Sequence, residues 1–122
     1  MKKTILLFGF DQIPEILPLA ETAKAFGAEL RTVQPRDCHL TLGRLAAGET
    51  GSPDDVPLIL GGRMVVLCGL DRQLDTLIPA LRKAGALCPK AVLTNQNREW
   101  LPQTLLVELQ RELTMMGSLK RK

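Results

Sequence analysis

The strongest constraint on the fold is a short pattern that occurs twice in the chain. Residues 6–11 read Leu-Leu-Phe-Gly-Phe-Asp, and residues 66–71 read Val-Leu-Cys-Gly-Leu-Asp. In both segments a continuous apolar run, typical of a strand covered on both faces, ends in a Gly-x-Asp turn. A helical pattern with an internal proline follows each turn, stops at Gly-Ala and leads into another strand pattern. The sequence therefore predicts two consecutive strand–helix–strand units.

Two architectures accommodate such a pair of units. The first is a single α/β domain of three layers, doubly wound around a mainly parallel four-strand sheet in the order 2-1-3-4, because helical crossovers join parallel neighbours. The second is a ferredoxin-like split βαβ pair with an antiparallel sheet. A short helical pattern near residues 37–48 separates the second strand from the third. This pattern favours the doubly wound sheet, since a ferredoxin-like chain needs only a hairpin there.

The length and composition fit one globular domain. The chain has 122 residues, of which 45% are hydrophobic and 24% are charged, so it can bury a real core. We expect the α/β domain to occupy residues 1–116, with a flexible loop rich in glycine and proline at residues 49–62. Residues 117–122 are expected to form a basic C-terminal tail.

If the sheet is parallel, all four strand exits lie along one edge, where open α/β sheets bind ligands. The two Gly-x-Asp turns would then sit beside the polar residues that end the last strand. The sequence predicts a small polar or anionic ligand there, held by helix N-termini and side-chain amides. The alternative is that each glycine only makes a turn and each aspartate only caps a helix. The candidate ligand-binding residues are Gly9, Asp11, Gly69, Asp71, Thr94, Asn95, Asn97 and Trp100.

The segment Lys-Ala-Val-Leu-Thr-Asn-Gln-Asn-Arg-Glu-Trp at residues 90–100 combines a short buried strand with an abrupt polar end. Pro102 suits the first position of the last helix, which places Trp100 before the N-cap and Leu105 at the fourth helical position. Trp100 is thus expected to pack on Leu105 as a hydrophobic staple. Alternatively, its ring stacks on a ligand or a partner.

No metal site or cofactor is predicted. Cys38, Cys68 and Cys88 are widely spaced, no Cys-x-x-Cys pair occurs, and an odd number of cysteines argues against a disulfide framework. His39 is the only histidine, so a zinc site would need it together with all three cysteines. Neither Gly-rich phosphate-binding motif occurs in the sequence.

The charge and the aromatic content limit the classes of partner. The net charge is +3, and the aromatic residues are three phenylalanines and one tryptophan, with no tyrosine, so the stacking platform of single-strand nucleic-acid binders is missing. The start of the chain superficially resembles a signal peptide, but its apolar run is too short, and no run approaches the length of a membrane span. We therefore expect a cytoplasmic protein that does not bind membranes or nucleic acid.

The second half of the chain resembles a small bacterial family of uncharacterised α/β proteins, described as a domain of unknown function. The likeness rests on Lys-Ala-Val-Leu-Thr-x-x-Asn-x-x-Trp at residues 90–100, on residues 68–85, and on Leu105 and Leu109; residues 41–45 also match. The chain departs from the family at Leu101-Pro102, where the family has a threonine cap. The resemblance implies no activity, although it suggests that Asn97 and Trp100 matter for fold or function.

These observations favour a cytoplasmic, non-enzymatic binding or regulatory module over an enzyme. The expected partners are an unidentified small polar ligand or another protein, with a homodimer among the options. The alternative is an enzyme that acts on a small anionic substrate with Asp11, Asp71 and Asn95 at the strand ends. The absence of a paired base and nucleophile in the sequence favours the binding module.

Overall fold

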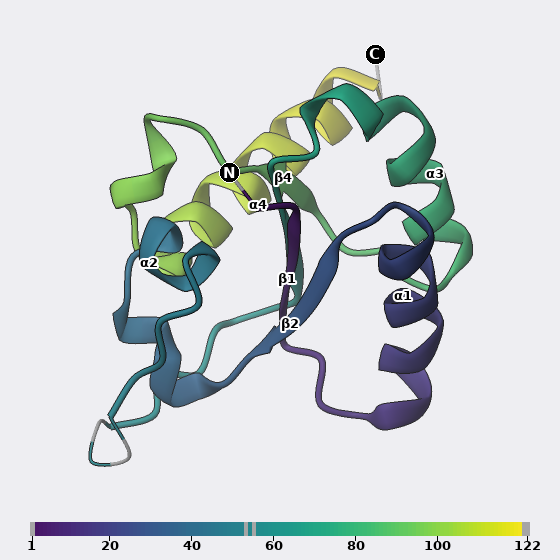
Figure 1. Ribbon diagram of the computed structural model, residues 1–122. Coiled ribbons are helices and arrows are strands. Elements are labelled where there is room, and N and C mark those ends of the chain that lie inside the picture. The colour runs from purple at the N-terminus through teal and green to yellow at the C-terminus, as the bar shows by residue number, and fades with distance from the viewer. Residues whose placement is uncertain (1, 53, 55, 121–122) are drawn as a thin grey trace.

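The structure is a computed structural model that describes residues 2–52, 54 and 56–120, with side chains described as far as residue 112. A central sheet lies between two layers of helices (Figure 1). The strands are β1 (Thr4–Phe8), β2 (Glu29–Val33), β3 (Met64–Cys68) and β4 (Lys90–Val92). The α-helices are α1 (Ile13–Ala25), α2 (Leu42–Ala46), α3 (Leu74–Lys83) and α4 (Pro102–Lys120), and the short 3-10 helices are η1 (Pro35–His39), η2 (Asp71–Gln73) and η3 (Asn97–Glu99).

The strand order is β2-β1-β3-β4, which confirms the predicted order of the sheet. The pairs β1–β2 and β3–β4 are parallel, as expected for two strand–helix–strand units. The central pair β1–β3 is antiparallel, with Thr4 opposite Cys68 and Phe8 opposite Met64. The prediction of a mainly parallel sheet was therefore wrong in its central pairing, and the sheet is mixed. The ferredoxin-like alternative, with its antiparallel sheet, is not the observed fold either.

The connection between the two units explains the antiparallel centre. A parallel crossover must carry the chain back along the full length of the sheet before the next strand begins. η1 and α2 carry the chain from the end of β2 to η3, which follows β4, since the N–H of Leu42 donates to the carbonyl of Trp100 at 2.9 Å. The segment of residues 47–63 then runs back to η1, where the N–H of Leu58 donates to the carbonyl of Pro35 at 2.9 Å. The chain enters β3 at the end where β2 left, beside Phe8.

Both faces of β1 and β3 are covered, which explains why these strands read as continuous apolar runs. All ten residues of the two strands are buried. On one face, Leu6 and Phe8 belong to a core shared with α2 and the start of α4. On the other face, Ile5 and Leu7 pack in a separate core with α1 and α3. The predicted three-layer arrangement of the domain is confirmed.

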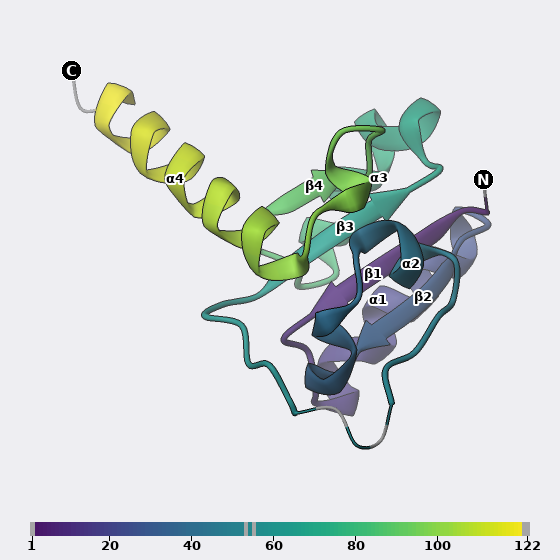
Figure 2. The same cartoon turned by 90° about the vertical axis from the view of Figure 1, so that its left-hand side faces the viewer.

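The last helix continues past the predicted end near Met116. It runs to Lys120 and projects away from the sheet (Figure 2), so part of the predicted basic tail is helical. Arg121 and Lys122 lie outside the described residues, as do the side chains of Leu113 and Met116. Within the described part of the chain, no helix combines the length and apolar character needed to cross a membrane.

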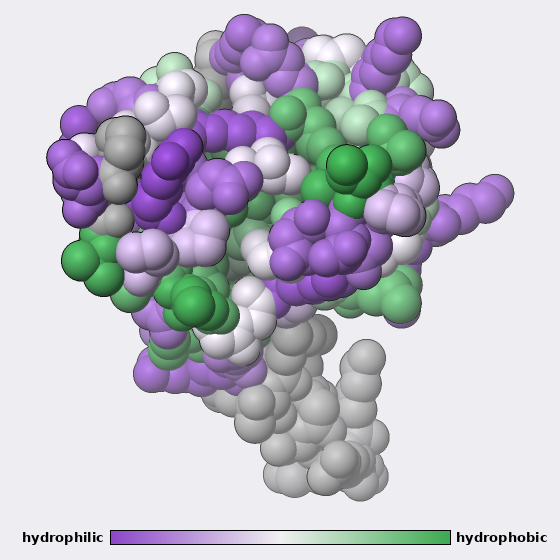
Figure 3. All heavy atoms as spheres, turned by 90° about the horizontal axis from the view of Figure 1, so that it is seen from below, coloured by the Kyte–Doolittle hydropathy of each residue, from purple (hydrophilic) through white to green (hydrophobic). Residues whose placement is uncertain are grey.

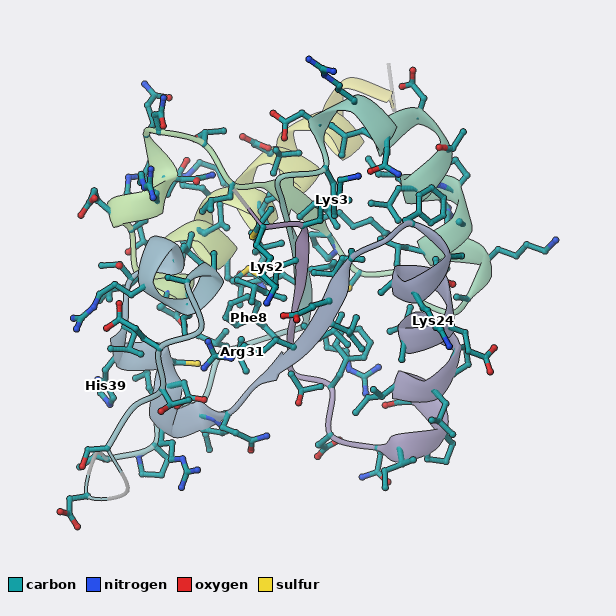
Figure 4. All side chains as sticks on the ribbon, in the orientation of Figure 1. Lys2, Lys3, Phe8, Lys24, Arg31 and His39 are labelled. Carbon is teal, nitrogen blue, oxygen red and sulfur yellow. The ribbon has the colours of Figure 1, made fainter. Side chains whose placement is uncertain are left out.

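One buried ion pair ties β2 to η1 and α2. Arg31 projects from β2 toward these helices (Figure 4), and its guanidinium donates to the carbonyl of Leu45 at 2.7 Å. A second nitrogen of Arg31 lies 3.6 Å from the Asp37 carboxylate, whose side chain is only 5% exposed. Asp37 also accepts hydrogen bonds from the backbone N–H groups of Gln34 at 3.2 Å and Gly51 at 2.7 Å. One carboxylate therefore joins an edge strand, a helix start and the long loop.

We predict that Asp37→Ala lowers the free energy of unfolding by about 3 kcal/mol or more, because it leaves a buried guanidinium and two N–H groups without their acceptor. Urea unfolding at neutral pH measures this change. Glu21→Ala removes an exposed carboxylate from the middle of α1 and should shift stability by no more than about 0.5 kcal/mol. Equal effects of the two substitutions would contradict the assigned role of Asp37.

Candidate functional site

The antiparallel centre of the sheet divides the sequence-predicted site residues between two opposite ends of the molecule. Gly9 and Asp11 lie where β1 ends, beside the end of β2. Gly69, Asp71 and the residues that follow β4 lie at the other end, because β3 runs opposite to β1. A single site that combines all of them does not form. The prediction of a single site failed because it assumed a parallel sheet. The strands themselves end at the residues predicted from the sequence.

The end with β1 and β2 contains a cavity of about 280 Å³. Figure 3 looks onto this end, where hydrophobic and hydrophilic residues interleave over the surface. The walls come from the ends of the two strands, from η1 and from the extended segment 58–62. Most of the lining is apolar, and the polar side chains are few. The lining residues are Phe8, Gly9, Phe10, Asp11, Val33, Gln34, Pro35, Cys38, Leu58, Ile59, Leu60 and Gly62.

Arg63 fixes the shape of the turn beside this cavity. Gly9 has a φ of 85°, a conformation that glycine adopts readily, and a Cβ there would come within 2.9 Å of Cγ of Arg63. Arg63 donates to the carbonyl of Gly9 at 3.1 Å, lies over the ring of Phe10 at 4.7 Å from its centroid, and pairs with Glu15 at 2.9 Å. No sequence pattern predicts this role, because Arg63 and Gly9 are far apart in the chain.

Asp11 does not cap α1, contrary to the simpler of the two sequence interpretations. The N-cap of α1 is Gln12, and no side chain caps it. Among the described residues, the carboxylate of Asp11 accepts one long hydrogen bond, of 3.4 Å, from the side-chain amide of Gln12. Asp71 is likewise no cap, since the N-cap of η2 is Leu70 and lacks a side-chain hydrogen bond. Asp11 therefore presents a largely uncommitted carboxylate on the cavity wall.

The segment after the long loop closes one side of the cavity and is held by η1. The N–H of Leu58 donates to the carbonyl of Pro35 at 2.9 Å. The Nε2 atom of His39 bonds the carbonyl of Val56. Leu58 and Leu60 face inward and pack on the core, while Ile59 between them is 83% exposed. This alternation marks an extended segment laid across the cavity, although it forms no strand.

The three cysteine thiols are not activated as nucleophiles and do not form a metal site. Cys38, which lines the cavity, donates from its thiol to the carbonyl of Gln34 at 3.6 Å, and burial raises its pKa to about 11. Burial also raises the pKa of the Cys68 thiol to about 12 and that of Cys88 above its ordinary value. Within the described residues, no group of three His, Cys, Asp or Glu side chains could hold a metal ion.

At the opposite end, Asn97 holds the turn after β4. Its side-chain oxygen accepts from the N–H of Thr94 at 2.8 Å, and its amide nitrogen donates to the carbonyl of Val92 at 3.0 Å. The hydroxyl of Thr94 accepts in return from the N–H of Asn97 at 3.1 Å. Asn97 is buried, whereas Asn95 is exposed. Asn97 thus has a structural role, and Asn95 points into solvent.

Trp100 is partly buried against the core cluster that contains Leu105. This position agrees with the hydrophobic staple predicted from the sequence. Hollows occur near this end. One is lined by Lys3, Gly69, Asp71, Arg72 and Gln73. Another, of about 400 Å³, lies between β4 and α4 and includes Thr94, Asn97 and Trp100 in its walls.

We predict that Asn97→Ala lowers the free energy of unfolding by about 2–3 kcal/mol, because it leaves Thr94 N–H and the Val92 carbonyl without partners. Asn95→Ala, the matched control in the same turn, should change it by less than about 0.5 kcal/mol. Thermal and urea unfolding of both variants measure the difference. Equal free energies of unfolding for the two variants would show that the Asn97 hydrogen bonds do not stabilise the turn.

The raised thiol pKa values predict a loss of stability in alkali. The folded protein keeps Cys38 and Cys68 protonated up to about pH 11 and 12, whereas unfolded thiols ionise near their ordinary value of about 9. Stability contributed by these groups is therefore complete below about pH 9 and falls as the pH rises from there through 11 and 12. Urea unfolding between pH 8 and 11 should show a steeper decline for the wild type than for Cys38→Ala/Cys68→Ala. Equal declines in the stability of the wild type and the double variant would contradict the raised pKa values of the two thiols.

Comparison with known proteins gives one match. Residues 63–116 match the model of a Domain of unknown function (DUF3783), which covers β3, α3, β4 and most of α4. No curated protein and no solved structure is significantly similar to the chain. The matched segment contains the turn around Asn97 and Trp100, and most of the residues that carry the sequence resemblance. It contains none of the residues that line the cavity at the β1 and β2 exits. The chain thus joins a domain of unknown function to a first strand–helix–strand unit that carries the cavity.

Proposed function

We propose that the protein is a non-enzymatic binding module whose ligand occupies the cavity at the ends of β1 and β2. The observation that carries this proposal is an apolar cavity of about 280 Å³ whose wall includes Asp11, a residue that does not cap a helix. Small-molecule sites are concave and mostly apolar, with a few polar groups that orient the ligand. The cavity lies at the carboxyl ends of two parallel strands, the usual place for ligands in open α/β sheets.

The charge in the cavity wall favours a ligand with a cationic or hydrogen-bond-donating group. Asp11 is the only charged side chain among the described residues that line the cavity. Its carboxylate accepts hydrogen bonds and repels anions. The guanidinium of Arg63 is already committed to the carbonyl of Gly9 and to Glu15. The ligand proposed here is therefore a small apolar molecule with an amine or another donor group, in place of the anion expected from the sequence.

The chemistry of the lining supports binding over catalysis. A nucleophilic cysteine needs a lowered pKa and a neighbouring base. Burial moves the pKa of Cys38 in the opposite direction, to about 11. The nearby carboxylate of Asp37 is occupied by backbone N–H groups and by Arg31, and the ring of His39 is bonded to Val56. The rival proposal, an enzyme for a small anion, lacks a partnered base and nucleophile at this site.

A cytoplasmic setting belongs to the same proposal. The three cysteines are free, and two of them are buried inside the domain. Unpaired thiols are typical of proteins in a reducing compartment.

We predict that phenethylamine binds in this cavity with a dissociation constant of about 1 mM, and that phenylacetate, of the same size but opposite charge, binds at least about tenfold more weakly. Two-dimensional NMR titration measures both. The expected shifts are in the backbone amides of Gly9, Gln34 and Gly62. Equal affinity for the two compounds, or shifts confined to the opposite end of the sheet, would contradict the proposal.

Asp11→Asn tests the charge without changing the shape of the side chain. It should abolish the preference for the amine while leaving the melting temperature within a few degrees of the wild type. Asp71→Asn is the matched control, because Asp71 occupies the equivalent turn at the opposite end of the sheet. If Asp71→Asn removes the preference and Asp11→Asn does not, the ligand site lies at the other end.

A further inference from the structure

The cavity proposed above as the ligand site is small and opens at the surface. Its volume is about 280 Å³, at the lower end of the range of about 300–1,000 Å³ that is typical of ligand pockets. Ile59 belongs to the lining although its side chain is exposed, so this residue marks the mouth of the cavity. A cavity of this size encloses one end of a ligand, and a longer ligand continues across the surface.

The walls also carry backbone N–H and C=O groups that the described part of the chain leaves unpaired. The backbone groups of Phe10 and Asp11, in the turn after β1, make no hydrogen bond to another described residue. The same holds for Ile59 and Leu60 in the extended segment. All four residues line the cavity. Since backbone polar groups require a partner in water, solvent or ligand, these groups are available to the backbone of an extended ligand.

Exposed apolar side chains flank the mouth of the cavity. Val56 and Ile59 are both exposed and belong to the segment after the long loop, and Ile13, also exposed, begins α1 two residues after Asp11. Figure 1 shows the start of α1 and this segment on opposite sides of the strand ends. Single exposed apolar residues are common on protein surfaces, but several around one cavity are typical of an interaction site.

The first residue of a peptide supplies every group that these walls can bind. Its ammonium matches the carboxylate of Asp11, its side chain matches the apolar lining, and the amides that follow match the unpaired backbone groups. A lysine side chain brings an ammonium but no backbone. A free amino acid has a carboxylate directly beside its ammonium, which Asp11 repels, whereas a peptide has a neutral amide at that position.

We propose that the cavity binds the free N-terminus of an extended, apolar segment of a protein partner. The ammonium pairs with Asp11, the first side chain enters the cavity, and the next amides lie against Ile59 and Leu60. The arrangement combines capture of an N-terminal amine with strand-like backbone pairing, both of which are established modes of peptide recognition. This inference rests on the function proposed above and names the class of its ligand.

The tetrapeptide amide Phe-Ala-Val-Ala-NH2 tests the inference, because its first residue contains the whole phenethylamine unit. Two-dimensional NMR titration of the full chain near about pH 6.5, where the α-amino group is protonated, gives the dissociation constants. The peptide should bind at least about tenfold more tightly than phenethylamine and should also shift the amides of Ile59 and Leu60. Acetylation of its N-terminus should weaken binding by at least about tenfold, because the charge is lost.

Modified ligands separate the backbone contribution from that of the amine. Methylation of the amide nitrogens of the second and third peptide residues removes two donors and should weaken binding by at least about fivefold. Phenylalanine amide should bind more tightly than phenylalanine, which carries the repelled carboxylate. Asp11→Asn should remove the difference between the free and the acetylated peptide, whereas Asp71→Asn, at the opposite end of the sheet, should keep it.

A peptide that binds no more tightly than phenethylamine would overturn the inference and leave the amine site in place. Equal affinities for the free and the acetylated peptide, or for the methylated and the unmethylated one, would also overturn it. If neither phenethylamine nor the peptide shifts the amides that surround the cavity, the proposed function itself fails, and the inference fails with it.

Discussion

The antiparallel pairing of β1 and β3 determines where everything else in this molecule can lie. It joins two parallel strand–helix–strand units that run in opposite directions, so that the second unit begins at the end of the sheet where the first unit finishes. The strand exits of the first unit form one end of the sheet and those of the second form the other. The cavity of the first end and the hollow between β4 and α4 at the second are therefore separate surfaces.

The elements of the fold could be predicted from the sequence because their signals are local. Continuous apolar runs marked β1 and β3, and the repeated Gly-x-Asp turn marked two equivalent units. The strand order followed from the connectivity. The direction of β3 could not be predicted, since it depends on whether the segment of residues 34–63 returns across the sheet. A helical pattern there was taken as a crossover, but the segment of residues 47–63 runs back from α2 to η1, so β3 begins at the end of the sheet where β2 finishes.

The candidate site was only partly visible for the same reason. Gly9 and Asp11 were identified as site residues, and both line the cavity. The other residues predicted for the same site lie at the opposite end of the sheet. The rest of the cavity wall comes from η1 and the segment 58–62. Arg63 was missed because its contacts span 54 residues of chain. Asn97 was placed on a polar rim, yet its three hydrogen bonds make it a structural residue, which only the coordinates of Thr94 and Val92 reveal.

The pairing of β1 with β3 can be tested without any ligand or partner. In an antiparallel pair, every second pair of facing residues, the one that exchanges no hydrogen bonds, brings its α-hydrogens close together, whereas a parallel pair keeps them apart. Nuclear Overhauser spectroscopy on labelled protein should show strong contacts between α-hydrogens in alternate facing pairs of β1 and β3, either Leu6 with Val66 or its neighbouring pair Ile5 with Leu67. Contacts that link Thr4 with Met64 and Phe8 with Cys68 would show parallel strands. That result would reunite the four strand exits at one edge and contradict the two-ended arrangement on which the proposed ligand site rests.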